Sequence, residues 1–128
     1  MNIRALILAT ALLLPSIAFP GLSGTYKFWG KNPVSEKYRG TATITEKDSV
    51  YTFTWHYDDG GTDIGTGVRK GDHLAVVFHS LDSPTFYGTI LYAIDGKELK
   101  GPYVGLQATK GGFDHMKKTK KDVSPAPA

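Results

Sequence analysis

The side chains that could act as bases or nitrogen ligands in this sequence are its four histidines, His56, His73, His79 and His115. Zinc sites gather His, Cys and carboxylate ligands at short spacings. Here no His-x-His pair and no cysteine occurs. In the alternating pattern described below, His56 and His79 fall opposite the inward positions. We therefore expect surface histidines and no metal site.

An acidic loop, Asp58-Asp59-Gly60-Gly61-Thr62-Asp63, brings several carboxylates together around two glycines. Clustered oxygens of this kind suit a hard cation such as calcium. However, no downstream glutamate completes a known calcium loop, and Asp/Gly segments are typical of hairpin turns because Gly accepts positive φ. The favoured interpretation is a hairpin turn, with a calcium site as the alternative.

Other catalytic patterns are lacking. No serine lies in a nucleophile elbow, and no Gly-rich segment precedes a helix to hold a phosphate. We therefore predict no catalytic residue, no cofactor and no enzyme activity. The alternative is a hydrolase or isomerase that works inside the fold, and a cavity with two or more convergent ionisable groups would favour it.

Aromatic residues remain as the main candidate for a binding site. They form either an ordinary core or the lining of a pocket, since ligand pockets are mostly apolar with few polar groups. Arg39 and Arg69 lie near turns and could anchor a ligand carboxylate, or pair with Asp114. The candidate ligand-binding residues are Tyr38, Arg39, Tyr51, Trp55, Arg69, Tyr92 and Tyr103.

Strands must position these side chains. Tyr51 to Tyr57 places an aromatic at every second residue, and successive strand side chains point to opposite faces. The same alternation recurs between Gly-rich or Asp/Gly turns, which predicts an all-β, antiparallel up-and-down meander barrel of seven or eight strands. The expected strands are 21–29, 38–45, 50–57, 62–69, 74–78, 86–94, 98–104 and 113–118.

Two of these strands have unusual patterns. Gly65 and Gly67 lie inside the fourth strand, where glycines mark a bend or a covering side chain, and we expect Trp55 or Tyr57 to cover them. The strands at 74–78 and 86–94 are apolar on both faces. Their outward row would make a large apolar patch, which predicts a homodimer interface. The alternative is a flattened barrel that covers these strands itself. That row is Ala75, Val77, Tyr87, Leu91 and Ala93.

Residues 1–18 resemble a secretory signal peptide. Arg4 precedes an apolar run that Pro15 ends, and the run is shorter than the ~20 residues of a membrane-spanning helix. The protein is therefore expected to be exported, to the periplasm or the medium, without a membrane span. Residues 19–118 form the expected barrel domain, and the absence of cysteine means that no disulfide stabilises it.

The tail, 119–128, is expected to be disordered, basic and Pro/Ala-rich. The sequence has 15 Lys+Arg against 12 Asp+Glu, and four of these lysines lie between Lys117 and Lys121. Without them the folded part is slightly acidic, so we expect no nucleic-acid partner. The lysine run is interpreted as a solvated end that folding does not need. The alternative is a contact with anionic lipid, glycan or nucleic acid.

Two short matches indicate a family resemblance. The segment Gly21-Leu22-Ser23-Gly24-Thr25-Tyr26 resembles the opening strand of avidin-like proteins, and its Gly-x-aromatic element is similar to that of lipocalins. Both families are barrels with a ligand cavity. The wider order of strands resembles an exported bacterial domain, mostly uncharacterised and sometimes labelled fibronectin-binding. No Asn/Ser/Tyr set for biotin follows Trp29, so the resemblance does not extend to biotin.

The resemblance and the residues together predict a secreted or periplasmic binding or interaction protein without catalysis. Its ligand would be a small amphipathic molecule or an extracellular macromolecule of the envelope or host.

Overall fold

Buried and exposed side chains alternate along every strand of the barrel. In β5 (His73–Ser80), for example, every second side chain is buried from Leu74 to Ser80. The computed structural model describes residues 21–119. The remaining strands are β1 (Gly24–Lys31), β2 (Lys37–Lys47), β3 (Val50–Tyr57), β4 (Thr62–Lys70), β6 (Tyr87–Asp95), β7 (Glu98–Gly105) and β8 (Gly112–Lys118).

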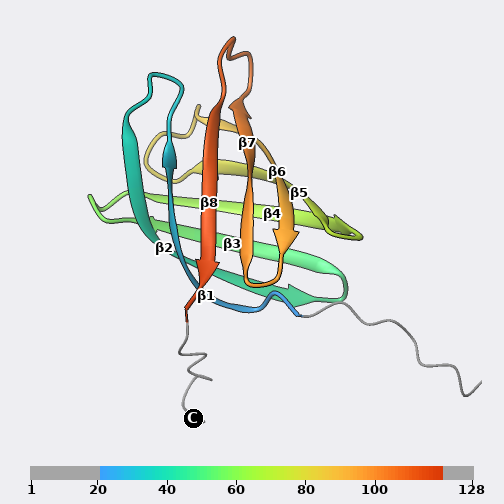
Figure 1. The fold of residues 1–128 in the computed structure, drawn as a ribbon. Coiled ribbons are helices and arrows are strands. Elements are labelled where there is room, and N and C mark those ends of the chain that lie inside the picture. Colours follow the sequence, from blue (N-terminus) through green and yellow to red (C-terminus); the bar gives the residue numbers. More distant parts are fainter. Residues whose placement is uncertain (1–20, 120–128) are drawn as a thin grey trace, which may run out of the picture.

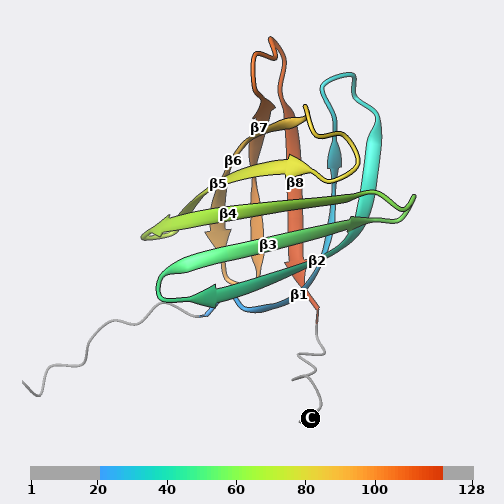
Figure 2. The same ribbon diagram turned by 180° about the vertical axis from the view of Figure 1, so that it is seen from behind.

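The eight strands form one closed antiparallel barrel in chain order, in which β8 returns to pair with β1 (Figures 1 and 2). The prediction of an all-β meander barrel is confirmed, with eight strands. The first strand begins three residues later than expected and β2 ends two residues later. Residues 1–18, interpreted as a signal peptide, and the tail from residue 120 lie outside the described part. Within residues 21–119, no helix has the length and apolarity to cross a membrane.

The barrel is strongly bent along β2. Figures 1 and 2 show that β3 and β4 cross the direction of β7 and β8 at a steep angle, and that β2 turns between the two directions. Gly40 lies in β2, and a Cβ atom there would collide with the carbonyl oxygen of His56 and the ring of Phe28. Glycine therefore allows the close approach that this bend requires.

The two ends of the barrel differ. At one end β2–β3, β4–β5 and β6–β7 are joined by two-residue turns, in which Asp48, Ser49, Gly71 and Gly96 have positive φ, as such hairpins require. The described ends of the chain, Gly21 and Thr119, lie at this same end (Figure 1). At the other end, here called the mouth, the four longer loops 32–36, 58–61, 81–86 and 106–111 gather.

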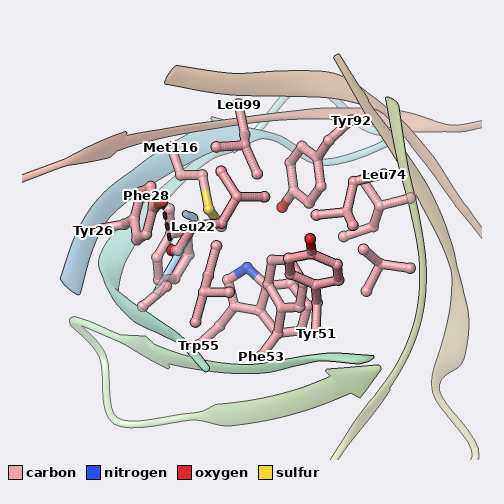
Figure 3. Close-up of a cluster of buried hydrophobic side chains, with 14 of the residues drawn as sticks. Leu22, Tyr26, Phe28, Tyr51, Phe53, Trp55, Leu74, Tyr92, Leu99 and Met116 are labelled. Atoms are coloured by element: carbon pink, nitrogen blue, oxygen red, sulfur yellow. Dashed lines mark hydrogen bonds between the residues drawn. The ribbon is translucent and has the colours of Figure 1, made fainter. Parts of the chain in front are cut away.

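Aromatic and aliphatic side chains fill the half of the barrel near the tight turns (Figure 3). Trp55 is 3% exposed, and its ring stacks on Phe53 at 5.0 Å between centroids. Phe53 also stacks on Tyr92 at 6.0 Å. A Cβ atom at Gly65 would lie 2.9 Å from the indole of Trp55, so Trp55 covers this glycine as expected. The side chain nearest to Gly67 is that of Val76 instead, at 3.0 Å.

Leu22 lies before β1 and packs into the core. Its carbonyl oxygen accepts a hydrogen bond of 2.7 Å from the hydroxyl of Tyr26, drawn as a dashed line in Figure 3. Both side chains are almost fully buried, together with Tyr51, Leu74 and Leu99. This half of the interior is therefore a solid core, and any space for a ligand must lie toward the mouth.

The outward apolar row on β5 and β6 is present. Val77 is 64% exposed, Leu91 50% and Tyr87 45%, while Ala75 is exposed and Ala93 half-buried. Patches of this kind often mark an interaction surface. A homodimer through this face stays a prediction, and sedimentation of the purified chain tests it.

Two lysines of the predicted run belong to the barrel. Lys117 and Lys118 lie in β8, where they pair with Lys27 and Tyr26 of β1. Lys118 also donates its amide to the carbonyl of Lys97, and the amide of Thr119 to that of Thr25. Lys117 and Lys118 are therefore part of the barrel and not of a solvated end. The expectation that folding does not need them stays a prediction, which the truncation below tests. Lys120 and Lys121 lie outside the described residues.

Replacing Trp55 with alanine should lower the free energy of unfolding by about 3 to 5 kcal/mol, because a buried large aromatic leaves a cavity. Trp29, which is 41% exposed, provides a matched control, and its replacement by alanine should cost about 1 kcal/mol or less. Denaturant unfolding followed by circular dichroism measures both. Equal losses for the two variants would contradict the assignment of Trp55 to the core.

Truncation after Met116 should destabilise the barrel by roughly 2 kcal/mol, because it removes several backbone hydrogen bonds between β8 and its neighbours. Truncation after Thr119 keeps these bonds and should leave the melting temperature unchanged. Thermal unfolding of the two truncated chains and the full chain distinguishes the effects. A full loss of stability in the longer truncated chain would show that residues beyond Thr119 are part of the fold.

Candidate functional site

A cavity of about 280 Å³ lies inside the barrel at its mouth. It begins where the solid core ends, at Trp55, and it reaches Asn32, Asp59 and Phe86 in the loops. Every side of the cavity is formed by an inward strand position or a mouth loop. The lining residues are Asn32, Tyr38, Trp55, Tyr57, Asp59, Asp63, Phe78, Phe86, Ile90, Tyr103 and Asp114.

Asp114 of β8 is the most deeply buried acid of the cavity, with 3% of its surface exposed. Its two carboxyl oxygens accept hydrogen bonds from the hydroxyls of Tyr38, at 2.7 Å, and Tyr92, at 2.5 Å. Burial raises the pKa of Asp114 to about 7, although the two hydroxyl donors act in the opposite direction. Asp114 can therefore gain or lose a proton near neutral pH.

Asp63 of β4 is the second acid, and 7% of its surface is exposed. The hydroxyl of Tyr57 donates a hydrogen bond of 2.7 Å to its Oδ2 atom. Burial raises the pKa of Asp63, hydrogen bonds from Tyr57 and Ser80 lower it, Asp82 raises it and His79 lowers it. The negative charge of Asp63 also raises the pKa of Asp114, so the two carboxyl groups form one coupled acidic site.

Four tyrosines surround these acids. Burial is the main cause that raises the pKa of Tyr38, Tyr57, Tyr92 and Tyr103, and the charge of Asp114 raises each of them further. The phenols therefore stay protonated and act as hydrogen-bond donors.

Glycines make room for two of the rings. A Cβ atom at Gly30 would overlap the hydroxyl of Tyr38, and one at Gly112 would overlap the ring of Tyr103. Both glycines lie on strands that flank the mouth, in β1 and at the start of β8. Small residues at these two positions thus allow the rings to lie across the neighbouring strands and reach the cavity.

The structure brings together four of the seven sequence candidates. Tyr38, Trp55 and Tyr103 line the cavity, and Tyr92 lies beneath it with its hydroxyl on Asp114. Tyr51 lies instead in the solid core, 4% exposed, near the filled end. The ligand-binding role of each residue stays a prediction.

The two arginines lie away from the cavity. Arg39 points outward from β2, and its Nε atom forms an ion pair of 3.1 Å with Asp58. Arg69 lies near the other end of β4 from Asp63 and donates its Nε–H to the carbonyl of Gly71 at 2.8 Å. Asp114 is bound by tyrosines, so the expected pairing of Asp114 with Arg39 is wrong, because Arg39 is on the outer face.

Sequence reasoning missed the two acids and Tyr57 as site residues. Asp63 belongs to the acidic loop and to the expected strand 62–69, and Asp114 is expected only as an ion-pair partner of the two arginines. Strand parity could have found both, because Asp63 shares its inward face with Gly65 and Gly67 in β4, and Asp114 shares its inward face with Met116 in β8. An acid at an inward position of a barrel strand is a signal for a functional group, since buried charges are costly.

The other sequence motifs do not form a site. His56, His73 and His79 are exposed, and His115 stacks on Trp29 at 5.4 Å. The acidic loop forms a turn, in which the amide of Gly61 donates to Asp59 at 3.3 Å and Gly60 has a φ of 108°. Within residues 21–119, no group of three His, Asp or Glu side chains could hold a metal ion.

A larger hollow of about 680 Å³ lies on the outer face of β1, β2 and β8. Trp29, Phe113 and His115 line it, with Lys31 and Lys37 beside them. Each of these side chains is exposed or half-buried, and none is a buried polar group that a ligand would satisfy. The cavity at the mouth is therefore the stronger candidate.

No protein-family model and no curated protein matches the sequence. Among solved structures, a redesigned beta barrel is similar in fold, with a TM-score of 0.69 and 12% identity; the match covers 77% of this chain and 92% of that chain. A de novo designed fluorescence-activating beta barrel has a TM-score of 0.61 and 14% identity, covering 76% of this chain and 93% of that one.

These comparisons show the fold alone, an eight-stranded antiparallel barrel. They do not support the avidin, lipocalin or fibronectin-binding label.

The acidic site predicts a specific dependence of stability on pH. Because the pKa of Asp114 is raised to about 7 in the folded chain, the folded state holds a proton that the unfolded state has already released above about pH 4. Stability should therefore fall as the pH rises from about 4 to about 7. Because the pKa of Asp63 is also raised, this acid too makes the stability fall as the pH rises.

Replacing Asp114 with asparagine should remove most of this fall. Asp58→Asn is the matched control, since Asp58 is an exposed acid on the outer face. In this variant the free energy of unfolding should depend on pH as it does in the unaltered chain. Urea unfolding at about pH 5 and about pH 8 measures the difference. An identical slope in the Asp114 variant and the unaltered chain would contradict the raised pKa.

Proposed function

We propose that this protein is an exported, non-catalytic binding protein that holds a small amphipathic ligand in the cavity at its mouth. The observation that supports this function most strongly is the division of the barrel interior. One half is a solid core, while the other keeps a cavity lined by aromatic rings and a few convergent polar groups. That combination is typical of small-molecule sites.

Export rests on the sequence of residues 1–18, which has the charge and the short apolar run of a signal peptide. The absence of cysteine is compatible with an oxidising compartment, because no free thiol would be oxidised there. The resemblance to exported avidin-like and lipocalin-like barrels belongs to the same proposal. An extracellular macromolecule stays the alternative ligand, which would bind at the outer apolar row instead.

Native mass spectrometry of the protein purified from its own organism tests this function. We expect a mass increment from one retained small molecule. Ile90→Trp should remove the increment, because Ile90 lines the cavity and a larger ring would fill it. Overpacking of this kind costs about 1 to 3 kcal/mol, so circular dichroism must confirm that the variant is folded.

Val77→Trp serves as the matched control, because Val77 points outward on the adjacent strand β5. It should retain the increment. The bare mass for the unaltered chain, or an increment that survives Ile90→Trp, would contradict binding in the cavity.

A second candidate, a barrel hydrolase or isomerase, is favoured by one observation. Two ionisable groups, Asp63 and Asp114, converge in the cavity, which is the condition stated above for an enzyme. A general acid works best with a pKa near the working pH, and Asp114 has a pKa of about 7. Incubating the retained ligand in excess with the protein decides between the candidates, since an enzyme would convert it and a binding protein would return it unchanged.

A further inference from the structure

The cavity at the mouth carries acidic groups without basic ones. Its lining includes Asp59, Asp63 and Asp114, and no Lys, Arg or His among its described residues. Asp59 lies at the rim, whereas Asp63 and Asp114 are buried. A ligand inside therefore meets a negative potential that water screens poorly, because charges in a confined apolar site interact more strongly than in solvent.

The charge of Asp114 is not balanced by a cation from the neighbouring strands. In the barrel, Asp114 pairs with Gly30 of β1 and Gly101 of β7, and its carboxyl oxygens bond to two neutral phenols. The other titratable group that acts on it is Asp63. Asp63 in turn is affected by the acid Asp82 and by His79, which lies on the outer face of β5.

Aromatic rings enclose the same space. Tyr38 meets Tyr57 at 5.8 Å and an interplanar angle of 66°, and it meets Tyr103 at 6.3 Å and 69°. Phe78 meets Tyr103 at 6.2 Å and 79°. At these angles the adjoining rings pack edge to face, and all four residues line the cavity. Aromatic faces attract cations within about 6 Å of the ring centre, and ammonium ligands are recognised in this way.

We propose that the cavity binds a small organic cation, in which a protonated amine lies against Asp114 and Asp63 and an apolar body lies among Tyr38, Tyr57, Trp55 and Phe78. This inference rests on the proposed function and names the class of its ligand. The size limits the class further. At a packing density of about 0.74, a cavity of about 280 Å³ accepts a molecule with one aromatic ring and a short aminoalkyl chain.

Other ligand classes fit the site less well. An anion would face the two acids with no basic group to receive it, and like charges in such a site repel. A neutral alcohol could bond to the tyrosines or acids but would leave the coupled carboxyl groups without a positive partner. An ammonium group offers three hydrogen-bond donors, and its positive charge favours the ionised form of both acids. An organic cation is therefore the ligand class that this acidic cavity favours.

The proposal predicts that amine binding is linked to proton release. An amine that binds ionised Asp114 must displace the proton that the carboxyl holds below its pKa of about 7. The affinity should therefore rise by about tenfold per pH unit between about pH 5 and about pH 7, then level off. A neutral ligand would show no such rise.

Three probes of similar shape test the inference: 2-phenylethylamine, 2-phenylethanol and 3-phenylpropanoate. Isothermal titration of the full folded chain at about pH 7.5 should show the amine binding at least about tenfold more tightly than the alcohol, and the carboxylate not binding. Asp114→Asn should weaken the amine by about tenfold or more and leave the alcohol unchanged. Asp58→Asn, an acid on the outer face, should change neither affinity.

The outcomes separate this inference from the proposed function. Equal affinity for the amine and the alcohol, or tighter binding of the carboxylate, would overturn the proposal that the ligand is a cation. The proposal of a small-molecule site would remain. No binding of any probe at about 1 mM would overturn both. If Asp114→Asn fails to fold by circular dichroism, Asp63→Asn takes its place, and an amine affinity that it leaves unchanged would likewise overturn the role of the two acids.

Discussion

The pairing of β8 with β1 is the constraint on which the rest of this structure depends. It closes the sheet, so each strand has two neighbours and each residue faces either the interior or the solvent. A closed barrel cannot slip by one residue without exposing its core and burying its surface. The inward position of Asp63 and Asp114 is thus fixed by the register, although burial of a carboxyl group is unfavourable.

Tyrosines offset this unfavourable burial. The hydroxyls of Tyr38, Tyr57 and Tyr92 each donate to one of the two acids, and among the described residues no buried side-chain polar atom lacks a partner. The polar network lies in the same half of the barrel as the cavity, while the other half is packed with aromatic and aliphatic side chains (Figure 3). The packed core and the polar cavity therefore lie at opposite ends of one small fold.

The sequence predicted the fold better than the site. Alternation and turn residues located all eight strands, because side-chain period and hairpin chemistry are local properties. The prediction that Trp55 covers a glycine of the fourth strand is also confirmed. The site depends on which end of the barrel each residue reaches. Tyr51 and Tyr38 follow the same inward pattern, but only Tyr38 is at the mouth. Arg39 was chosen for its nearness to a turn, although its outward parity already excluded it from the interior.

The position of the described chain ends affects how the protein can be attached to a surface. Gly21 and Thr119 both lie at the filled end, opposite the mouth (Figure 1). A linker joined at either point would attach the barrel by its filled end and leave the mouth free of the attachment. An immobilised form would then keep its cavity accessible to the surrounding solution, as a sensor layer or an affinity resin requires.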